Sequence, residues 1–310
     1  MKVGVIGTGN MGENHIKTYL SLTNVCELIG IYDADEKKKL QIAKKYQVKP
    51  FASMDELLQA ADAVSIVVPT EHHYEIGLAC IDHQVHMLME KPIAHTMTEA
   101  QELARRAKQA NVKLQVGHIE LYNPFIQTLA KKIESETILA MDFKRMSPYS
   151  NRVEEFDVVR DLMIHDLYIL NGFLKDSLTD FHAFGRVMKN TPKHAAVMIK
   201  SEKGTITQLT ASYFAKRKMR TIQILTEKAL YEADILNRKI NITHNMNEQT
   251  SGIPVSIKQV LYVDDSLQPL TAELLDFIHC IQLNRDPYVT AEDGIQGLCL
   301  ANEISETIRK

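Results

Sequence analysis

Several features are scarce or absent in this sequence of 310 residues. It has no basic excess, since 36 lysines and arginines face 39 aspartates and glutamates, and this balance argues against a nucleic acid partner or an anionic membrane surface. No run reaches the ~18 apolar residues of a membrane-spanning helix. The N-terminus shows no basic, apolar and small-residue signal pattern. We therefore expect a cytoplasmic protein that binds neither nucleic acid nor membrane.

Cysteine is also scarce. The four cysteines stand alone in apolar surroundings, at spacings that suit neither a zinc site nor a disulfide framework, and this indicates a reducing compartment. The adjacent pair His72 and His73 would point in different directions on a helix or strand. No cysteine or acid is spaced to join them, so we expect no metal site.

The first 120 residues alternate between apolar strands and helical patterns. This alternation, without polar residues inside the strands, predicts a parallel sheet covered by helices on both faces. Ligands of such sheets bind at the carboxyl ends of the strands. The expected strands are 2–9, 26–33, a short one at 49–51, 63–69, 86–92 and 113–118, and the expected helices are 10–22, 35–47, 53–60, 72–83 and 96–110.

A glycine loop follows the first strand, as Gly7-Thr8-Gly9-Asn10-Met11-Gly12. In a G-x-G-x-x-G loop between a strand and a helix, the glycines allow a tight turn, a close approach of the backbone to a pyrophosphate and close helix packing. The amino end of the helix then offers free N–H groups to the phosphates. The pattern predicts a dinucleotide-binding Rossmann domain. A glycine turn in an α/β fold that binds no nucleotide is the alternative.

An acid closes the second strand. Asp33 lies 21 residues beyond Gly12, where a carboxylate can accept both hydroxyls of the adenosine ribose and would repel a 2′-phosphate. The next residues, Ala34 and Asp35, include no arginine to receive such a phosphate. The sequence therefore favours NAD over NADP as the cofactor.

The stretch "VHMLMEKPIAH" at 85–95 ends a buried strand with Glu90, Lys91 and Pro92. Two readings are open at this point. The strand can simply end, with its charges in water, or Lys91 can be aimed at a ligand bound at the carboxyl edge of the sheet.

The chain changes character from about residue 137. Alternating strands at 138–148, 195–214 (a hairpin) and 221–244 predict an open, mostly antiparallel sheet, with helices at about 157–173, 269–284 and 291–309 and an exposed loop at 249–256. We expect an α/β chain with a Rossmann domain at 1–120 and an α+β domain for substrate binding and oligomerisation at 121–310. The last helix, 291–309, is able to pack back on the first domain.

The helix near 157–173 carries a second chemical signal. Asp161 and His165 are four residues apart and so share one face of an otherwise apolar helix. They can serve catalysis, or they can form a solvated ridge or a buried pair that satisfies itself.

These markers together resemble the glucose–fructose oxidoreductase, inositol dehydrogenase and rhizopine-catabolism (Gfo/Idh/MocA) family. The resemblance covers the whole chain and rests on the glycine loop, Asp33, "VVPTEHHYE" (67–75), "EKP" (90–92), "GH" (117–118) and the D-x-x-x-H of Asp161 and His165. It implies an NAD-dependent oxidoreductase that acts on CH–OH groups. It also implies a homodimer or homotetramer, because relatives bury the open face of the second sheet against another subunit.

The resemblance also implies residue roles. Catalysis would fall to Lys91, His165 and Asp161, with Lys91 beside the nicotinamide and often followed by a cis bond to Pro92, His165 as the usual proton acceptor and Asp161 on neighbouring hydroxyls. Which of Lys91 and His165 takes the proton stays open. Cofactor contacts would come from Gly7, Gly9, Asn10, Met11, Gly12, Asp33, Pro69, Thr70, His73, Glu90 and Lys91. Substrate contacts would come from Lys91, His118, Tyr122, Asn123, Arg152, Asp161 and His165.

Narrower motifs indicate the substrate. "VGHIELYNP" (116–124) and "RDLMIHDL" (160–167) resemble the UDP-N-acetylglucosamine 3-dehydrogenases, although Leu121 and Tyr168 stand where that group usually has an arginine and an acid. We therefore expect oxidation of the 3-hydroxyl of such a nucleotide sugar. A dehydrogenase of a free polyol or simple sugar, and a non-catalytic dinucleotide sensor, are the alternatives. An intact Lys91, Asp161 and His165 argue against the sensor.

Overall fold

The computed structural model describes residues 1–150, 153–174, 176–245, 256–264 and 267–310. By its contacts the chain divides into two compact units, the first made of residues 1–122 and 268–298 and the second of residues 123–267 and 299–310. The expected loop at 249–256 lies outside the described residues except for Ser256, which begins a strand. No helix among the described residues has the length and apolar character needed to cross a membrane.

The first unit is built on a parallel sheet of five strands in the order β2-β1-β3-β4-β5. The order reverses at β1, with β2 on one side and β3 on the other, and this places a crevice for a ligand at the carboxyl ends of the strands. The strands are β1 (Lys2–Ile6), β2 (Glu27–Tyr32), β3 (Ala63–Ile66), β4 (His86–Glu90) and β5 (Leu114–Gly117).

Helices cover both faces of this sheet, because its strands are apolar on both sides. One core cluster packs around Leu57, Cys80 and Leu103 from α3, α4 and α5. The other packs around Ile16, Ile42 and Phe277 from α1, α2 and α8. The helices are α1 (Asn10–Ser21), α2 (Glu36–Tyr46), α3 (Met54–Ala60), α4 (His73–Asp82), α5 (Met97–Gln109) and α8 (Pro269–Gln282).

Helix starts in the first unit follow their capping residues. Ser53 accepts a hydrogen bond from the Glu56 amide at the start of α3, which is one half of a capping box. A complete box forms instead at α5, where Thr96 and Glu99 exchange side-chain to backbone hydrogen bonds. The expected strand at 49–51 is only a single bridge from Pro50 to Ile31, since proline has no N–H to continue a ladder.

The chain returns to the first unit after leaving it. The sequence placed the domain boundary at 120 and the later residues in the second domain, with the last helix, 291–309, able to pack back on the first. Contacts instead end the first segment at Tyr122 and bring back α8 together with the beginning of α9 (Ala291–Arg309), as far as Leu298. An apolar helix fits any apolar surface of the right width, so the sequence alone cannot say which sheet α8 covers.

The second unit contains an eight-stranded sheet in the order β13-β12-β11-β10-β6-β9-β8-β7, in which only β6 and β9 pair in parallel. The expected mostly antiparallel sheet is therefore confirmed, and β7 and α6 are elements that the sequence reading did not identify. The strands are β6 (Ile138–Met146), β7 (Leu178–Met188), β8 (Thr191–Ser201), β9 (Ile206–Ser212), β10 (Met219–Thr226), β11 (Ala229–Asp234), β12 (Lys239–Asn245) and β13 (Ser256–Tyr262).

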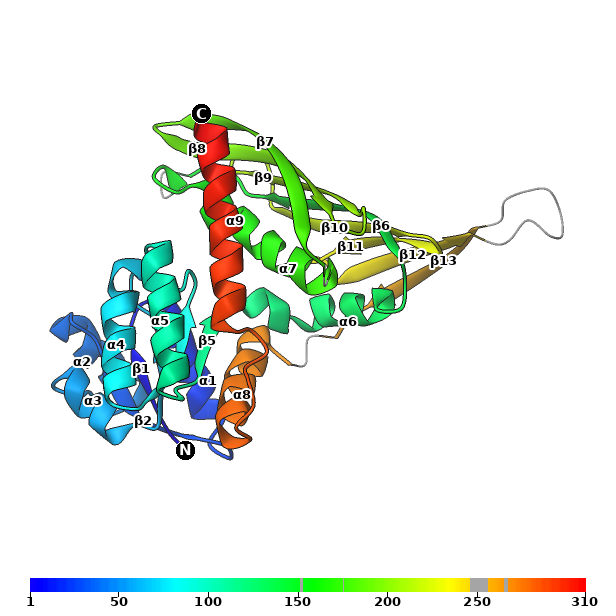
Figure 1. Ribbon diagram of the computed structural model, residues 1–310. Coiled ribbons are helices and arrows are strands. Elements are labelled where there is room, and N and C mark those ends of the chain that lie inside the picture. Colours follow the sequence, from blue (N-terminus) through cyan, green and yellow to red (C-terminus); the bar gives the residue numbers. More distant parts are fainter. Residues whose placement is uncertain (151–152, 175, 246–255, 265–266) are drawn as a thin grey trace. The chain divides into compact units, whose positions relative to one another are not determined.

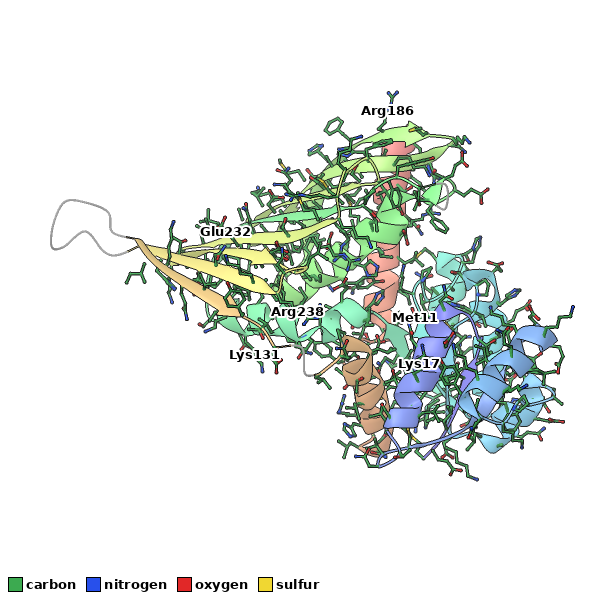
Figure 2. All side chains as sticks on the ribbon, turned by 180° about the vertical axis from the view of Figure 1, so that it is seen from behind. Met11, Lys17, Lys131, Arg186, Glu232 and Arg238 are labelled. Carbon is green, nitrogen blue, oxygen red and sulfur yellow. The ribbon has the colours of Figure 1, made fainter. Side chains whose placement is uncertain are left out.

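Helices lie along one face of this sheet, among them α6 (Pro124–Ile133) and α7 (Ile164–Leu174) (Figure 1). The strands alternate accordingly. Ile222 and Ile224 on β10 are buried, while Gln223 and Leu225 between and beside them are exposed. On β11, Glu232 points to the exposed face (Figure 2).

A buried ion pair fixes α7 to the sheet. Arg145 on β6 donates from Nε to Asp166 Oδ1 at 2.9 Å, and its terminal nitrogen lies 2.8 Å from the same oxygen. Both side chains are almost fully buried, at 2% and 5% exposure. Since Asp166 follows His165 directly, this pair sets where the first turn of α7 lies.

We predict that Arg145→Met destabilises the second unit strongly. Removal of one partner from a buried pair leaves an uncompensated charge, which costs roughly 3–5 kcal/mol. Arg186→Met on β7 is the matched control, because Arg186 is exposed (Figure 2). Denaturant unfolding of the two variants measures the difference, and equal losses would contradict the role given to the pair.

Candidate functional site

The glycine loop has the geometry that a dinucleotide needs. Gly7 has φ +98°, and a Cβ there would lie 2.3 Å from the Val67 carbonyl oxygen. A Cβ at Gly12 would lie 2.0 Å from the Gly7 carbonyl oxygen, so only glycine lets α1 approach the loop this closely. The space beside Gly9 is open, with only the Lys38 amine within contact range, at 3.8 Å from a Cβ placed there. The backbone at the amino end of α1 is therefore accessible to a ligand, as pyrophosphate binding requires.

Asp33 is held in place by hydrogen bonds, two of which come from the glycine loop. Its Oδ2 accepts hydrogen bonds from the amide and the hydroxyl of Thr8, each at 2.7 Å, and its Oδ1 accepts one from the Asp35 amide at 2.9 Å. Burial raises the pKa of Asp33, but these hydrogen bonds outweigh it, so the net pKa is lowered. The group is an oriented carboxylate, which suits acceptance of ribose hydroxyls.

Lys38 is a residue that the sequence reading missed. It lies in the first turn of α2, where its charge also lowers the pKa of Asp33. Its amine near Gly9 places a cation beside the phosphate loop. The signal in the sequence was weak, since Lys38 stands in the run "EKKKL" and reads as one of several solvated lysines.

Lys91 stands at the carboxyl end of β4, on the same edge as the glycine loop. Its amide donates to Glu90 Oε2 at 3.3 Å, and the Lys91–Pro92 bond is cis, as the family resemblance implied. His73 packs against the loop that contains Pro92. Its ring nitrogens are 2.9 Å from the Pro92 carbonyl oxygen and 3.0 Å from the Val68 carbonyl oxygen.

Two histidines beside this loop are neutral. Burial lowers the pKa of His73, and the carbonyls of Val68 and Pro92 oppose this only in part. Burial, then the charge of Lys91, puts the pKa of His118 well below its usual value. His73 is 1% exposed and ties the end of β3 to the loop, which makes it a support of the cofactor edge, and its direct contact with the cofactor stays a prediction.

Tyr122, a predicted substrate contact, is paired within the first unit. Its side chain is 3% exposed, its hydroxyl donates to Asp276 Oδ2 at 2.8 Å, and its ring packs edge to face with Tyr288. Asn123 uses its side-chain oxygen to cap α6, by accepting from the Phe125 amide at 3.0 Å. The Tyr122 hydroxyl and the Asn123 side-chain oxygen each have a partner in the protein, and the role of these two residues in substrate binding stays a prediction. Arg152 lies outside the described residues.

The remaining cofactor candidates occupy surface positions of the first unit. Asn10 is exposed and Met11 is half-buried in the first turn of α1 (Figure 2). Pro69 and Thr70 follow β3 at its carboxyl end, where Thr70 opens a short 3-10 turn. Both groups therefore lie on the edge of the sheet that carries the glycine loop.

The second unit positions Asp161 and His165 on one continuous helical segment. Asp161 lies in a π-helical turn, Val159–Met163, which continues directly into α7 with His165 in its first turn. Such turns recur at functional sites. The segment is fixed at its start by Asp157, which accepts hydrogen bonds from the Val159 amide at 2.9 Å and from Ser305.

Tyr213 is a further residue that the sequence did not reveal. It is buried just beyond β9, and its hydroxyl donates a hydrogen bond to Asp161 Oδ2. Burial, and then this hydrogen bond, raises the pKa of Tyr213, so the hydroxyl keeps its proton. Because the two residues are 52 positions apart in sequence, only the fold brings them together.

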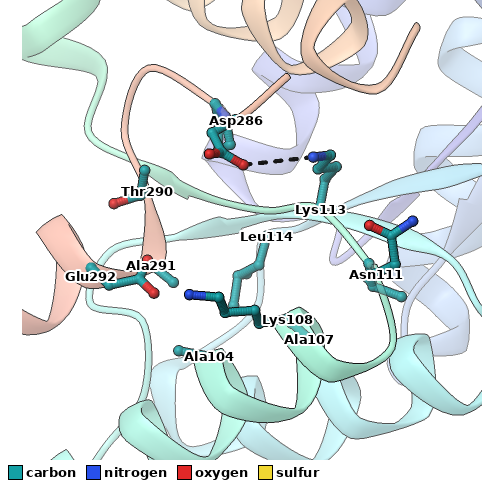
Figure 3. A pocket seen from close by; sticks show the side chains of 12 residues that line it. Ala104, Ala107, Lys108, Asn111, Lys113, Leu114, Asp286, Thr290, Ala291 and Glu292 are labelled. Carbon is teal, nitrogen blue, oxygen red and sulfur yellow. Dashed lines mark ion pairs between the residues drawn. The ribbon is translucent and has the colours of Figure 1, made fainter. Parts of the chain in front are cut away.

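A pocket of about 400 Å³ opens elsewhere in the first unit (Figure 3). It lies between α5, the start of β5 and the segment that leads into α9, with Lys108 and Glu292 reaching into it and Lys113 paired to Asp286 at 3.6 Å. Lys113 and Leu114 precede or begin β5, so the pocket opens at the amino ends of the strands. Parallel sheets bind ligands at the other edge.

The parallel sheet and the glycine loop at its carboxyl edge are those of a dinucleotide-binding domain. Residues 1–118 match the Gfo/Idh/MocA oxidoreductase family, described by its NAD-binding Rossmann fold. The chain is similar to this family over these residues, and it is an oxidoreductase that acts on CH–OH groups with NAD as its cofactor. The arrangement of Gly7, Gly12, Asp33 and the open backbone at Gly9 fits that cofactor.

Particular relatives are similar over nearly the whole chain. The UDP-N-acetylglucosamine 3-dehydrogenase of Acidithiobacillus ferrooxidans is 29% identical, covering 96% of this chain and 93% of the relative. Its solved structure superposes with a TM-score of 0.92, covering 100% and 97%. The myo-inositol 2-dehydrogenase of Thermotoga maritima is 22% identical, covering 100% and 97%. An NAD-binding oxidoreductase of Klebsiella pneumoniae, 18% identical, shares the fold with a TM-score of 0.87, covering 99% and 96%.

We predict that the chain binds NAD(H) much more tightly than NADP(H). Asp33 offers an oriented carboxylate to the ribose and would repel a 2′-phosphate. Asp33→Ala should narrow the preference, since it removes the hydrogen bonds and the repulsion together. Fluorescence titration of both cofactors measures this, with Asp82→Ala, an exposed acid at the end of α4, as the control. Equal affinities in the unaltered protein would refute NAD selectivity.

Proposed function

We propose that this oxidoreductase oxidises a secondary alcohol of a sugar, by removal of a hydride from the carbinol carbon and a proton from its hydroxyl. We further propose that the substrate is a UDP-N-acetylglucosamine-type nucleotide sugar oxidised at its 3-hydroxyl. The reaction class is supported by Lys91, a lysine at the carboxyl edge of an NAD-binding sheet. The substrate is supported by the full-length similarity to an enzyme named for that reaction.

The residues divide the chemistry in a simple way. NAD accepts the hydride when it is bound. The hydroxyl proton must leave as the hydride departs, so a base within hydrogen-bond reach is needed. We assign that role to His165 or Lys91, and we assign to a cationic Lys91 the stabilisation of negative charge on the substrate oxygen. Neutral His118, whose pKa is depressed by burial and by Lys91, adds no competing positive charge.

Asp161 would accept hydrogen bonds from neighbouring sugar hydroxyls. A carboxylate already fixed by Tyr213 loses little freedom when a sugar binds, so the geometry favours substrate orientation over proton transfer. Its place one helical turn before His165 puts both groups on one side of the segment.

A free polyol is the second candidate substrate. The observation in its favour is the similarity, over the full length of the chain, to a myo-inositol 2-dehydrogenase, at the lower identity of 22%. The two candidates separate in one assay. Turnover of NAD with UDP-sugars, free sugars and inositols, followed by NADH absorbance, should be highest with UDP-N-acetylglucosamine, and higher turnover with inositol would favour the polyol.

We predict that Lys91→Ala loses turnover far more than NAD affinity. Loss of a proton-transfer or oxyanion group lowers kcat roughly a hundredfold to ten-thousandfold. Lys113→Ala is the matched control, because that lysine precedes β5 at the opposite edge of the sheet. His165→Ala should lose turnover similarly, in a pH-dependent way if His165 is the base. Asp161→Asn should mainly raise KM.

The competing view holds that Asp161 and His165 only stabilise the second unit. It predicts lower melting temperatures with unchanged turnover per folded molecule. His182→Ala tests the specificity of any effect, since His182 also lies near an aspartate, Asp180, but is exposed on β7. Wild-type turnover in all three site variants would overturn the catalytic assignment and leave the family's fold and cofactor untouched.

We also propose that the chain forms a homodimer or homotetramer through the exposed face of the second sheet. Large apolar side chains are exposed there between polar ones, and an apolar patch of this kind marks an association surface. They are Phe184, Met198, Ile206, Leu225, Val260 and Tyr262.

We predict that light scattering gives a dimer or tetramer mass at micromolar concentration. The double substitution Met198→Glu and Leu225→Glu should shift the mass toward the monomer, because charged groups would be buried at the contact. Leu283→Glu, an exposed leucine of the first unit, should leave the mass unchanged. A monomer mass for the unaltered chain would reject the proposal.

A further inference from the structure

One buried acidic side chain close to Glu90, the residue before Lys91, has no role in the site described above. Glu273 on α8 is 0% exposed, and neither of its carboxyl oxygens makes a hydrogen bond with the described residues. Buried polar atoms are almost always paired, so an unpaired buried carboxylate needs an explanation. The helix is held close to the sheet here, because Gln115 on β5 donates to the Glu273 carbonyl oxygen at 3.2 Å.

Two other side chains meet Glu273. One side-chain atom each of His15, Glu90 and Glu273 lies within 4.8 Å of the other two. His15 on α1 is 0% exposed, and its Nε2 is 3.4 Å from Glu90 Oε1. Neither ring nitrogen of His15 nor that oxygen of Glu90 makes a hydrogen bond with the described residues. The three side chains come from three elements of the first unit.

Two carboxylates this close, one of them fully buried, cannot both stay ionised at low cost. One added proton removes a negative charge and supplies a hydrogen-bond donor. The resulting carboxylic acid can then donate to a neighbouring oxygen or nitrogen atom that otherwise faces only acceptors. Burial, then the charges of Glu90 and Asp276, raises the pKa of Glu273 well above its usual value. Of the two carboxyls, Glu273 is the more buried.

We infer that Glu273 carries a proton at neutral pH and shares it with Glu90 and His15, so that it acts as a positioning residue for Lys91. Glu90 joins the two parts. Its Oε1 faces the buried cluster, while its Oε2 accepts the hydrogen bond of the Lys91 amide. Gly117 on β5 packs against it, since a Cβ there would lie 3.2 Å from Glu90 Cα and from its Cδ. A fixed Glu90 therefore fixes the backbone from which Lys91 projects.

Titratable side chains face Glu273 from each of the elements that pack against it. Tyr19 and Tyr122 are neutral phenols whose pKa values burial raises. Asp276, one turn further along α8, accepts from Tyr122 and from the Tyr288 amide and also meets Arg285. The full set is His15 and Tyr19 on α1, Glu90 on β4, Tyr122 before α6 and Asp276 on α8.

The first test is the pH dependence of stability. A carboxyl whose pKa is raised on folding stabilises the native state fully below its unfolded pKa of about 4.3, and this stability is lost as the pH rises through the folded pKa. Glu273→Gln cannot ionise. Its melting temperature relative to the unaltered protein should therefore rise with pH, by up to roughly 4 °C per pH unit. Glu27→Gln, an exposed glutamate of β2, should show a constant difference.

The second test separates positioning from packing and rests on the proposed function. Glu273→Gln keeps a hydrogen-bond donor and should keep kcat near the value of the unaltered protein. The unaltered protein should lose kcat at alkaline pH as Glu273 ionises, and Glu273→Gln should not. Glu273→Leu keeps the volume but has no donor, and should lower kcat by up to roughly a hundredfold at unchanged NAD affinity. Turnover restored by Gln and not by Leu, in equally folded proteins, supports positioning, and equal turnover of the two refutes it.

The two arms fail in different ways. The stability arm needs no substrate, so it stands even if no sugar is turned over. A pH-independent difference between Glu273→Gln and the parent would show that Glu273 carries no raised pKa and would overturn the inference. Metal analysis of the protein as isolated gives the other decisive outcome. About one equivalent of zinc or manganese, lost in Glu273→Gln, would mean that a cation and not a proton compensates the cluster.

Discussion

The first unit depends on the parallel direction of its five strands. Parallel strands end at one common edge, so the glycine loop after β1, Asp33 after β2 and Lys91 after β4 are brought to the same side without any direct link between them. Close packing then sharpens the arrangement. Gly12 lets α1 reach the loop, and Thr8 orients Asp33 through two hydrogen bonds. The cofactor edge is a consequence of topology first and of side-chain detail second.

The second unit uses buried polar contacts instead. Its sheet offers only a broad apolar face, on which a helix could slide or rotate at little cost. Arg145 with Asp166, Tyr213 with Asp161, and Asp157 with Ser305 each demand one geometry, since a misplaced helix would leave a buried charge or hydroxyl unpaired. These three contacts surround the five residues from Asp161 to His165 and give that segment a defined position within its unit.

A large part of the fold could be predicted from the sequence. The alternation of apolar strands and helices predicts the parallel sheet, and period-two patterns predict the antiparallel one, because burial on two faces or on one face leaves different signatures. The misses have physical causes. Pro50 has no N–H with which to extend a ladder of hydrogen bonds. Helix α6 begins at the Asn123 cap, and asparagine is equally common in loops. Helix α8 returns to the first unit, because the apolar face of a helix does not specify which sheet it covers.

The sequence by itself determined the residues that carry local chemistry: the glycine loop, Asp33, the E-K-P turn and the Asp161–His165 spacing, since each depends on neighbours within one turn of chain. Tertiary structure alone decided which side chains support them. Tyr213 reaches Asp161 across 52 positions, and Glu273 reaches Glu90 and His15 from a helix near the end of the chain. It also buried Tyr122 and His73, which the sequence alone does not reveal. Burial and partners far along the chain are properties of the packed molecule, and no short pattern encodes them.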